Sequence, residues 1–359
     1  EGLPIIYGRR RLEAVNVFKR VSSNNINASA GTYPNFVLAG PGTSDEDIDR
    51  PNVWLHRIDV WGQGEINAIK RFWVDGDQHT HTRFNARPYF RAISKFGTES
   101  QTAFTALSGV SPQWGSNHKG NGVAYSWTRF LNSKNKPQFT AEPILRAEIE
   151  GLKLYDPRLD SSVAGGSGTH SFDDPSTWAY GNNRALVVLN YLMTSFGFNA
   201  PRDELDLESF IVAADLCDEP MTIPLPATNT SGAQQIHYNP QTGFDVAVNI
   251  GERYPGDRIY QASDSVSQAQ YVADAVIDPT DGVVDNLKIL LEEFGWSLSW
   301  SNGRHRLVIE NDVSAPAMTF DETAIFGGWN IERGNRSERY NRVTVSFPNA
   351  NKDYENDTV

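Results

Sequence analysis

The sequence predicts a β-rich α+β protein, in which strands dominate the first half and helices enter after residue 182. Three observations predict this class. Nineteen prolines and 29 glycines imply many turns between short strands. Apolar and polar residues alternate repeatedly through residues 1–156, which favours a meander or a small barrel. Apolar residues at helical spacing follow later, together with one clear two-strand hairpin.

The expected strands of the first domain, residues 1–156, are β-prone runs separated by turn residues. Gly8 and the arginine triplet that follows it break the first run, so the triplet is expected in a turn. Asp75 and Gly76 offer a further turn. The strands are expected at Pro4–Gly8, Leu12–Phe18, Val53–Val60, Ile66–Val74, Val123–Leu131 and Ile144–Leu154. Alternation places Arg57 and Asp59 on one face of the third strand. In the last strand it places Leu145, Ala147 and Ile149 on the face opposite Arg146, Glu148 and Glu150.

A Gly/Ser-rich linker is expected over residues 157–182, and a second, α+β domain over 183–312. Its first helix is predicted at Asn183–Phe196, with Gly197 as a left-handed cap. A second begins at the N-cap Asp206, with Phe210, Ala213, Ala214 and Cys217 inward, and a third spans about Val283–Phe294. An irregular excursion is expected over 219–264, with a hairpin around Phe244–Ile250. Residues 313–359 begin a further β domain, with strands at Ile325–Arg333 and Asn341–Phe347.

The strongest local signal is a hairpin in which Asn302 and Gly303 form a two-residue type I′ turn. This turn places Trp300 opposite His305 and Leu298 opposite Leu307. The apolar side chains then share one face, which is expected to lie against the preceding helix.

Charge and cysteine content exclude several classes of protein. The net charge of −12 disfavours a grip on nucleic acid, because phosphate binding needs a basic face, yet it would let DNA pass without sticking. The single cysteine, Cys217, excludes an internal disulfide. No apolar run is long enough to span a membrane. The first residue is not Met and the end is polar, so we expect a portion of a longer product.

The search for chemistry finds neither a phosphate-binding loop nor a nucleophile elbow, and no cofactor is expected. One segment could hold a metal, because two aspartates and two histidines fall within seven residues; a solvated polar turn explains the same pattern. The weak metal candidates are Asp75, Asp77, His79 and His81. Nine Trp and 44 acidic residues also leave room for a glycoside hydrolase, which needs two spaced carboxylates beside aromatic rings.

Several phrases, taken in order, resemble the central tail-tip (host specificity) protein, or baseplate hub, of lambda-like long-tailed bacteriophages. They cover nearly the whole chain, from residue 4 to about residue 347. The phrases lie at Pro4–Arg11, Leu55–Gly76, Gly120–Tyr125, Ile149–Arg158, Tyr180–Leu186, Leu192–Gly197, Asp206–Asp218, Asp285–Gly303 and Tyr340–Val345.

The resemblance implies tube-like β-barrel hub domains, with the helix-plus-hairpin α+β domain inserted. It implies a homotrimer at the distal end of the virion tail, which closes the tail tube and opens for DNA ejection. The implied partners are the distal tail protein ring, the C-terminus of the tape-measure protein and downstream tail fibre or receptor-binding parts, with the host surface contacted indirectly. DNA would pass through without specific binding.

We therefore expect assembly and not catalysis. Two charged sets are hypothesised to contribute to subunit contacts: Arg9, Arg10 and Arg11 in the first, and Arg146, Glu148 and Glu150 in the second. Two alternatives stay open. A carbohydrate-cleaving tail module would turn over polysaccharide, and an isolated receptor-binding domain would hold a host surface sugar or porin by itself.

Overall fold

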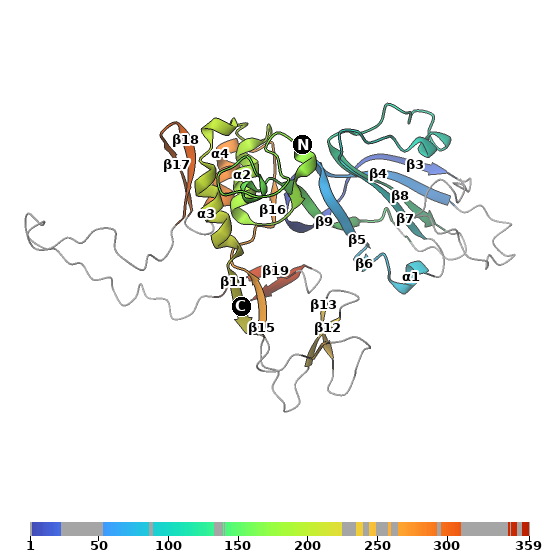
Figure 1. Cartoon of the computed structure of the whole chain (residues 1–359). Helices are drawn as coiled ribbons and strands as arrows, with labels where there is room; N and C mark the ends of the chain where they lie inside the picture. The colour runs from blue at the N-terminus through green and yellow to red at the C-terminus, as the bar shows by residue number, and fades with distance from the viewer. Residues whose placement is uncertain are drawn as a thin grey trace, which may run out of the picture. The chain divides into compact units, whose positions relative to one another are not determined.

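The computed structural model describes residues 2–22, 53–85, 89–132, 139, 141–224, 235–239, 244–248, 258–259, 265–292, 296–309, 344, 346–349 and 354–358. These residues fall into two compact units (Figure 1). Unit 1 consists of Glu1–Glu219 and Ala269–Ile309, and unit 2 consists of Pro220–Gln268 and Glu310–Val359. The fold is β-rich α+β, as the sequence predicts.

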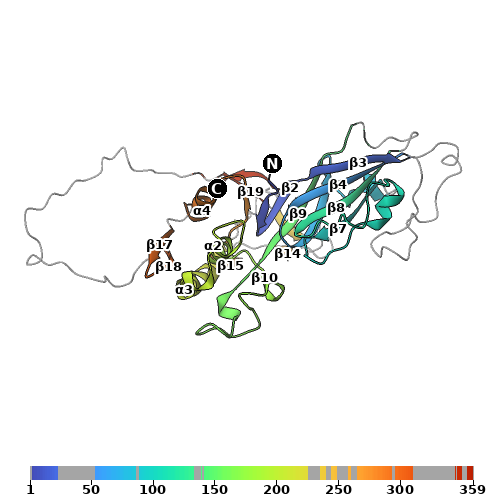
Figure 2. The same ribbon diagram turned by 90° about the horizontal axis from the view of Figure 1, so that it is seen from above.

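Two antiparallel sheets form most of the β structure of unit 1. The four-stranded sheet has the order β3-β4-β8-β7, and the five-stranded sheet has the order β10-β9-β5-β6 with β2 paired to β9. Figure 2 shows β3 alongside β4 and β2 beside β9. Their bounds are β2 (Arg9–Glu13), β3 (Val15–Ser22), β4 (Val53–Gln63), β5 (Ile66–Val74), β6 (Asp77–Gln78), β7 (Phe90–Phe96), β8 (Val123–Asn132), β9 (Leu145–Leu154) and β10 (Ala179–Tyr180).

The two sheets share a core, because inward side chains of both belong to one buried cluster that includes Trp61, Phe130, Ala147 and Ile149. The alternation expected in β9 is confirmed: Leu145, Ala147 and Ile149 are buried in this core. The described strands form open sheets within the chain and not a closed barrel.

A second cluster covers the opposite face of the four-stranded sheet, where Trp127 and Ile58 pack against Phe104 and Leu107. Leu107 belongs to the short 3-10 helix η2 (Thr105–Gly109) in the connection between β7 and β8. Strand β7 was not expected from the sequence. Its pattern, in which Arg91 and Lys95 interrupt apolar residues, does not stand out locally, although pairing with β8 defines it.

Helices α2 (Arg184–Met193), α3 (Leu207–Asp218) and α4 (Val283–Glu292) surround a third core. The side chain of Asn183 caps α2 by accepting a hydrogen bond from the backbone N–H of Leu186, at 3.3 Å. Short strands β1 (Ile5–Tyr7) and β16 (Ala275–Ile277) pair beside this core, and a four-residue helix, α1 (Thr82–Asn85), follows β6.

One helix end assigned from the sequence is wrong, and a second is confirmed in position but not in its hydrogen bond. Helix α2 ends at Met193, and Gly197 does not have the left-handed conformation expected of a cap. Glycine is needed there for another reason, since a Cβ at this position would lie 1.8 Å from the carbonyl oxygen of Tyr191. Asp206 does precede α3, but its side chain makes no capping hydrogen bond. The inward residues of α3 are as expected: Phe210, Ala213, Ala214 and Cys217.

The hairpin of β17 (Ser297–Ser301) and β18 (Arg304–Val308) has the predicted register, with Leu298 opposite Leu307 and Trp300 opposite His305. Asn302 and Gly303 have φ values of 54° and 76°, which are those of a type I′ turn. Asp75 and Gly76, at 52° and 91°, make the same kind of turn between β5 and β6.

The arginine triplet lies inside strand β2 and not in a turn, which corrects the sequence expectation. Gly8, at φ 63°, ends β1 and redirects the chain, and β2 then pairs with β9 along its whole length. The segment 157–182 contains two 3-10 turns, η3 (Pro157–Leu159) and η4 (Pro175–Thr177), and strand β10. The domain boundaries expected after residues 156 and 182 stay a prediction.

The described part of unit 2 consists of strands. A three-stranded sheet has the order β13-β12-β14, and two further pairs are β11-β15 and β19-β20. The strand expected at Ile325–Arg333 lies outside the described residues. The bounds are β11 (Pro220–Pro224), β12 (Gln235–Asn239), β13 (Phe244–Val248), β14 (Arg258–Ile259), β15 (Ser265–Ala269), β19 (Ser346–Asn349) and β20 (Glu355–Thr358).

Candidate assembly surfaces

The outward face of the five-stranded sheet gathers five of the six residues expected at subunit contacts. In the register of β2 with β9, Arg9 lies opposite Glu150, Arg11 opposite Glu148, and Glu13 opposite Arg146. Arg10 lies opposite Ile149 and therefore belongs to the other face of the sheet. We call the outward surface the basic sheet face; it consists of Arg9, Arg11, Glu13, Lys70, Arg71, Arg146, Glu148 and Glu150.

Glu148 is the centre of this face and is 0% exposed. Its carboxylate forms ion pairs with Arg9 on β2 and Arg71 on β5, so one strand on each side of β9 holds it. Burial by itself would raise the pKa of Glu148, but the hydrogen bonds and charges of Arg71 and Arg9 outweigh burial and bring the pKa below its usual value.

Trp73 on β5 lies between two guanidinium groups, those of Arg11 at 5.2 Å and Arg71 at 5.3 Å from its ring centroid. The indole is 2% exposed. Cation–π contacts of this kind hold the arginine side chains in fixed positions. The basic sheet face is therefore ordered before any partner meets it.

The cations of this face are more exposed than most of its carboxylates. The side chains of Arg9, Lys70 and Arg146 are 42–45% exposed, whereas those of Glu148 and Glu150 are 0% and 13% exposed. Glu150 pairs with Lys70 at 3.2 Å. Five cations and three carboxylates give a formal excess of two positive charges, and only Glu13 among the carboxylates is well exposed, at 58%.

Helix α3 carries the opposite charge. Glu208, Val212, Asp215 and Glu219 follow the i, i+4, i+7, i+11 spacing of one helical face, and all four are exposed. No basic residue occurs in the sequence of α3. We call these four residues the acidic stripe. Val212 in its middle is 65% exposed. The inward face of this helix was predicted from the sequence and the stripe was not, although the spacing of its acids indicates it.

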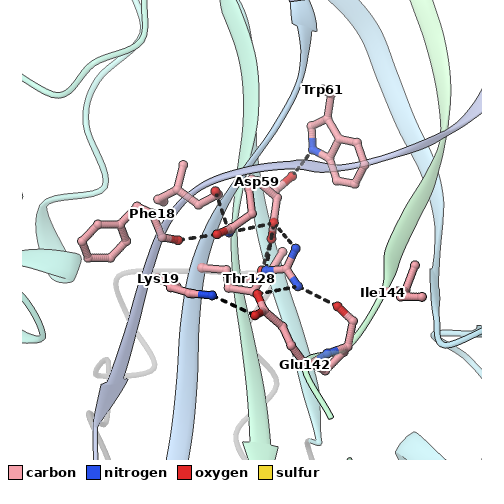
Figure 3. Close-up of polar contacts among 12 residues, drawn as sticks. Phe18, Lys19, Asp59, Trp61, Thr128, Glu142 and Ile144 are labelled. Atoms are coloured by element: carbon pink, nitrogen blue, oxygen red, sulfur yellow. Dashed lines mark hydrogen bonds and ion pairs between the residues drawn. The ribbon is translucent and has the colours of Figure 1, made fainter. Parts of the chain in front are cut away.

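The edge strand β3 is tied to the sheet by a buried polar network, the polar clamp (Figure 3). Asp59, 0% exposed, accepts hydrogen bonds from Asn16 at 3.2 Å, from Arg57 at 2.6 and 3.0 Å, and from Thr128. These residues come from β3, β4 and β8, so the carboxylate joins three adjacent strands. Sequence alternation put Arg57 and Asp59 on one face but gave no sign that both are buried.

A second link of the polar clamp ties β3 to the segment before β9. Lys19 forms an ion pair with Glu142 at 2.9 Å, and Arg57 donates to the carbonyl oxygen of Pro143 at 2.6 Å (Figure 3). The hydrogen bond from Lys19, together with the positive charges of Lys19 and Arg57, lowers the pKa of Glu142. The clamp therefore fixes strand β3 at two points along its length, at Asn16 and at Lys19.

Strand β3 has a β-bulge, because its register with β4 shifts between Asn16 and Phe18. Val17 is the extra residue and is 58% exposed. Val15 and Val21, at 42% and 60%, are exposed as well. An eight-residue edge strand thus presents apolar side chains outward while Phe18 anchors it in the core.

The weak metal candidates are engaged with other groups. Asp75 and Asp77 form ion pairs with Arg83 at 3.7 and 3.0 Å. His79 is half-buried against Phe72, and burial lowers its pKa, whereas His81 is exposed. No group of three or more His, Cys, Asp or Glu side chains is arranged to hold a metal in the part of the chain that the structure describes.

No protein-family model matches the sequence, and neither does any curated protein. Among the solved structures that resemble the chain is one from the "Virion of native gene transfer agent (GTA) particle", with 11% identity and a TM-score of 0.32 over 81% of this chain and 72% of that chain. None of the described helices is long and apolar enough to cross a membrane.

Proposed function

We propose that this chain is a structural virion protein of a phage tail tip, where three copies form a hub that closes the tail tube. The observation that carries the proposal is strand β3. Among the strands that the structure describes it is the edge of an open sheet, it is fixed by the polar clamp, and its Val15, Val17 and Val21 are exposed. An exposed edge with apolar side chains is a surface for joining another chain. Its rigid attachment suits the strand to assembly.

The ordered phrases between residue 4 and about residue 347 support a tail-tip hub among the possible assemblies. In such a hub, the tube-like barrel closes between copies and not within one chain, which is compatible with open sheets in the single chain. The role is structural and not enzymatic. The chain lies at the distal end of the virion tail after assembly in the bacterial cytoplasm.

The partners in this proposal are the distal tail protein ring, the C-terminus of the tape-measure protein and downstream fibre or receptor-binding parts. DNA passes through the opened hub during ejection. A net charge of −12 favours passage without sticking, because like charges repel. Subunit contacts involve the charged residues of β2 and β9.

An image reconstruction of intact tails, with this chain labelled, tests the proposal. We expect threefold density at the distal end of the tail tube. A label elsewhere in the particle, or a chain that stays monomeric at every concentration, would overturn the proposal. Polysaccharide turnover by the purified chain would favour a carbohydrate-cleaving module instead, and tight binding of a host surface sugar or porin by the isolated chain would favour a receptor-binding domain.

The role of strand β3 has its own test. The substitution Val17→Lys places a charge on the outward bulge without touching the core, so trimer formation should weaken while the far-ultraviolet spectrum stays the same. Val284→Lys is the matched control, since Val284 on α4 is 55% exposed. Equal trimerisation of both variants and the unmodified protein would remove β3 from the interface.

A further inference from the structure

We infer that neighbouring copies of this chain meet through opposite charges, with the acidic stripe of α3 on one copy lying on the basic sheet face of the next. The inference rests on the proposed function and adds which two surfaces meet. Its starting point is the sign of each surface. The chain carries 44 acidic and 32 basic residues, so a surface with an excess of positive charge is unusual in this molecule.

The sheet face is basic in its exposed atoms because its two central carboxylates lie beneath the cations. Glu148 is covered by Arg9 and Arg71, and Glu150 is 13% exposed. A partner therefore meets mainly ammonium and guanidinium groups. Since Trp73 already holds Arg11 and Arg71 in place, their ordering costs little when an acidic surface arrives.

The acidic stripe matches this face in chemistry and in dimensions. From Glu208 to Asp218, the last residue of α3, the helix advances about 15 Å at 1.5 Å per residue, and Glu219 follows directly as the C-cap. Strand β9 advances from Arg146 to Glu150 over about 13 Å at 3.3 Å per residue, so the two charged rows are of similar length. The acids of the stripe are seven and four residues apart, about two turns and one turn of helix, so their carboxylates can reach cations spaced along the sheet.

Each surface also carries one exposed aliphatic side chain. Val212 interrupts the acidic stripe, and Ile144, two residues before Arg146 on the outward-facing register, is 50% exposed. An interface with apolar contact inside a charged rim buries these side chains. Opposite charges around them fix the register of the contact more than they add affinity.

The two surfaces lie apart on the same copy, as α3 and β2 do in Figure 2. Within one copy Arg158 pairs with Asp215 of the stripe at 2.9 Å, so the stripe offers mainly the exposed carboxylates of Glu208 and Glu219 to a neighbour. A contact between different surfaces of identical chains is heterologous, and repeated around an axis it closes a ring. This geometry suits a ring of copies.

Charge reversal of the full chain tests the inference, with association measured by sedimentation at low salt. Lys70→Glu with Arg146→Glu reverses exposed cations, and Glu208→Lys with Glu219→Lys reverses the stripe. We expect each pair to weaken association about tenfold or more. All four changes together should restore it, because the charges are then exchanged and opposite again. Lys119→Glu with Lys288→Glu is the matched control at exposed positions and should change nothing.

The outcomes separate this inference from the proposed function. Trimers that form equally well in all variants would overturn the charge pairing while leaving the tail-tip proposal intact. The charge pairing would also be overturned if each double variant associates more weakly, the fourfold variant does not regain association, and all far-ultraviolet spectra are unchanged. If a pair of charge reversals unfolds the chain, the neutral replacements Lys70→Gln and Arg146→Gln are used instead. We then expect a smaller loss of association. A protein that never associates overturns both.

Discussion

Acid should destabilise this protein through one buried histidine. His56 on β4 is 1% exposed, its ring stacks on Trp127 with centroids 5.9 Å apart, and neither ring nitrogen has a hydrogen-bond partner among the described residues. Burial, and then the nearby charge of Arg129, lowers the pKa of His56 to about 4. Arg20 on β3 lies opposite His56 in the sheet, so the charges that face it are positive. The imidazole is therefore neutral in the folded protein.

The size of the effect follows from linkage between protonation and folding. The folded pKa lies below the unfolded value of about 6.5, so unfolding takes up a proton as the pH falls. Stability is complete above pH 6.5 and declines as the pH falls toward 4. With a folded pKa of about 4, His56 contributes a loss of about 2 kcal/mol at pH 5 and about 3 kcal/mol at pH 4.

The substitution His56→Phe keeps an aromatic ring against Trp127 and removes the titration. Urea unfolding, followed by far-ultraviolet circular dichroism at pH 8 and pH 5, gives the free energy of unfolding of both proteins. Between these pH values the wild type should lose about 2 kcal/mol more than the variant. His56→Gln should show the same difference, since neither replacement titrates. Equal losses in all three proteins would refute the reasoning.

Three other substitutions or reactions test separate parts of the structure. Gly197→Ala should lower the free energy of unfolding by about 3 kcal/mol, because the added Cβ overlaps the carbonyl oxygen of Tyr191; urea unfolding measures it, and an unchanged midpoint would contradict the close approach. Glu148→Gln should cost about 3 kcal/mol at pH 7 by leaving Arg9 and Arg71 without their buried charge. Since the folded pKa of Glu148 is lowered, that difference should shrink as the pH falls below the unfolded pKa near 4.3. Burial raises the pKa of the Cys217 thiol to about 11, so a thiol reagent at pH 8 should label it only after urea unfolds the chain; rapid labelling of the folded protein would show that the helix core opens.

Local signals predicted the parts of the fold that local chemistry determines. Asn302 and Gly303 can both adopt positive φ at low cost, and this property alone sets the turn and the register of β17 with β18. Asp75 and Gly76 work in the same way. Helix α3 was predicted from its inward residues because their spacing is intrinsic to the helix.

The wrong and missing assignments depend on residues far away in the sequence. Arg9 and Arg11 form a strand because β9, about 140 residues later, places Glu150 and Glu148 opposite them. Gly197 is required by the carbonyl oxygen of Tyr191 and not by a helix cap. In both cases the sequence shows the residue, but tertiary contacts decide its role.

The candidate interface also depends on both local sequence patterns and contacts between residues far apart in the chain. Alternation placed Arg146, Glu148 and Glu150 on one face, and from the sequence that face carries more negative charge than positive. Strands β2 and β5 then add Arg9, Arg11, Lys70 and Arg71, and two of the arginines bury Glu148. The sign of the surface therefore changes when the sheet forms. We infer the pairing with α3 of another copy from this change of sign, because a basic face on so acidic a chain favours an acidic partner.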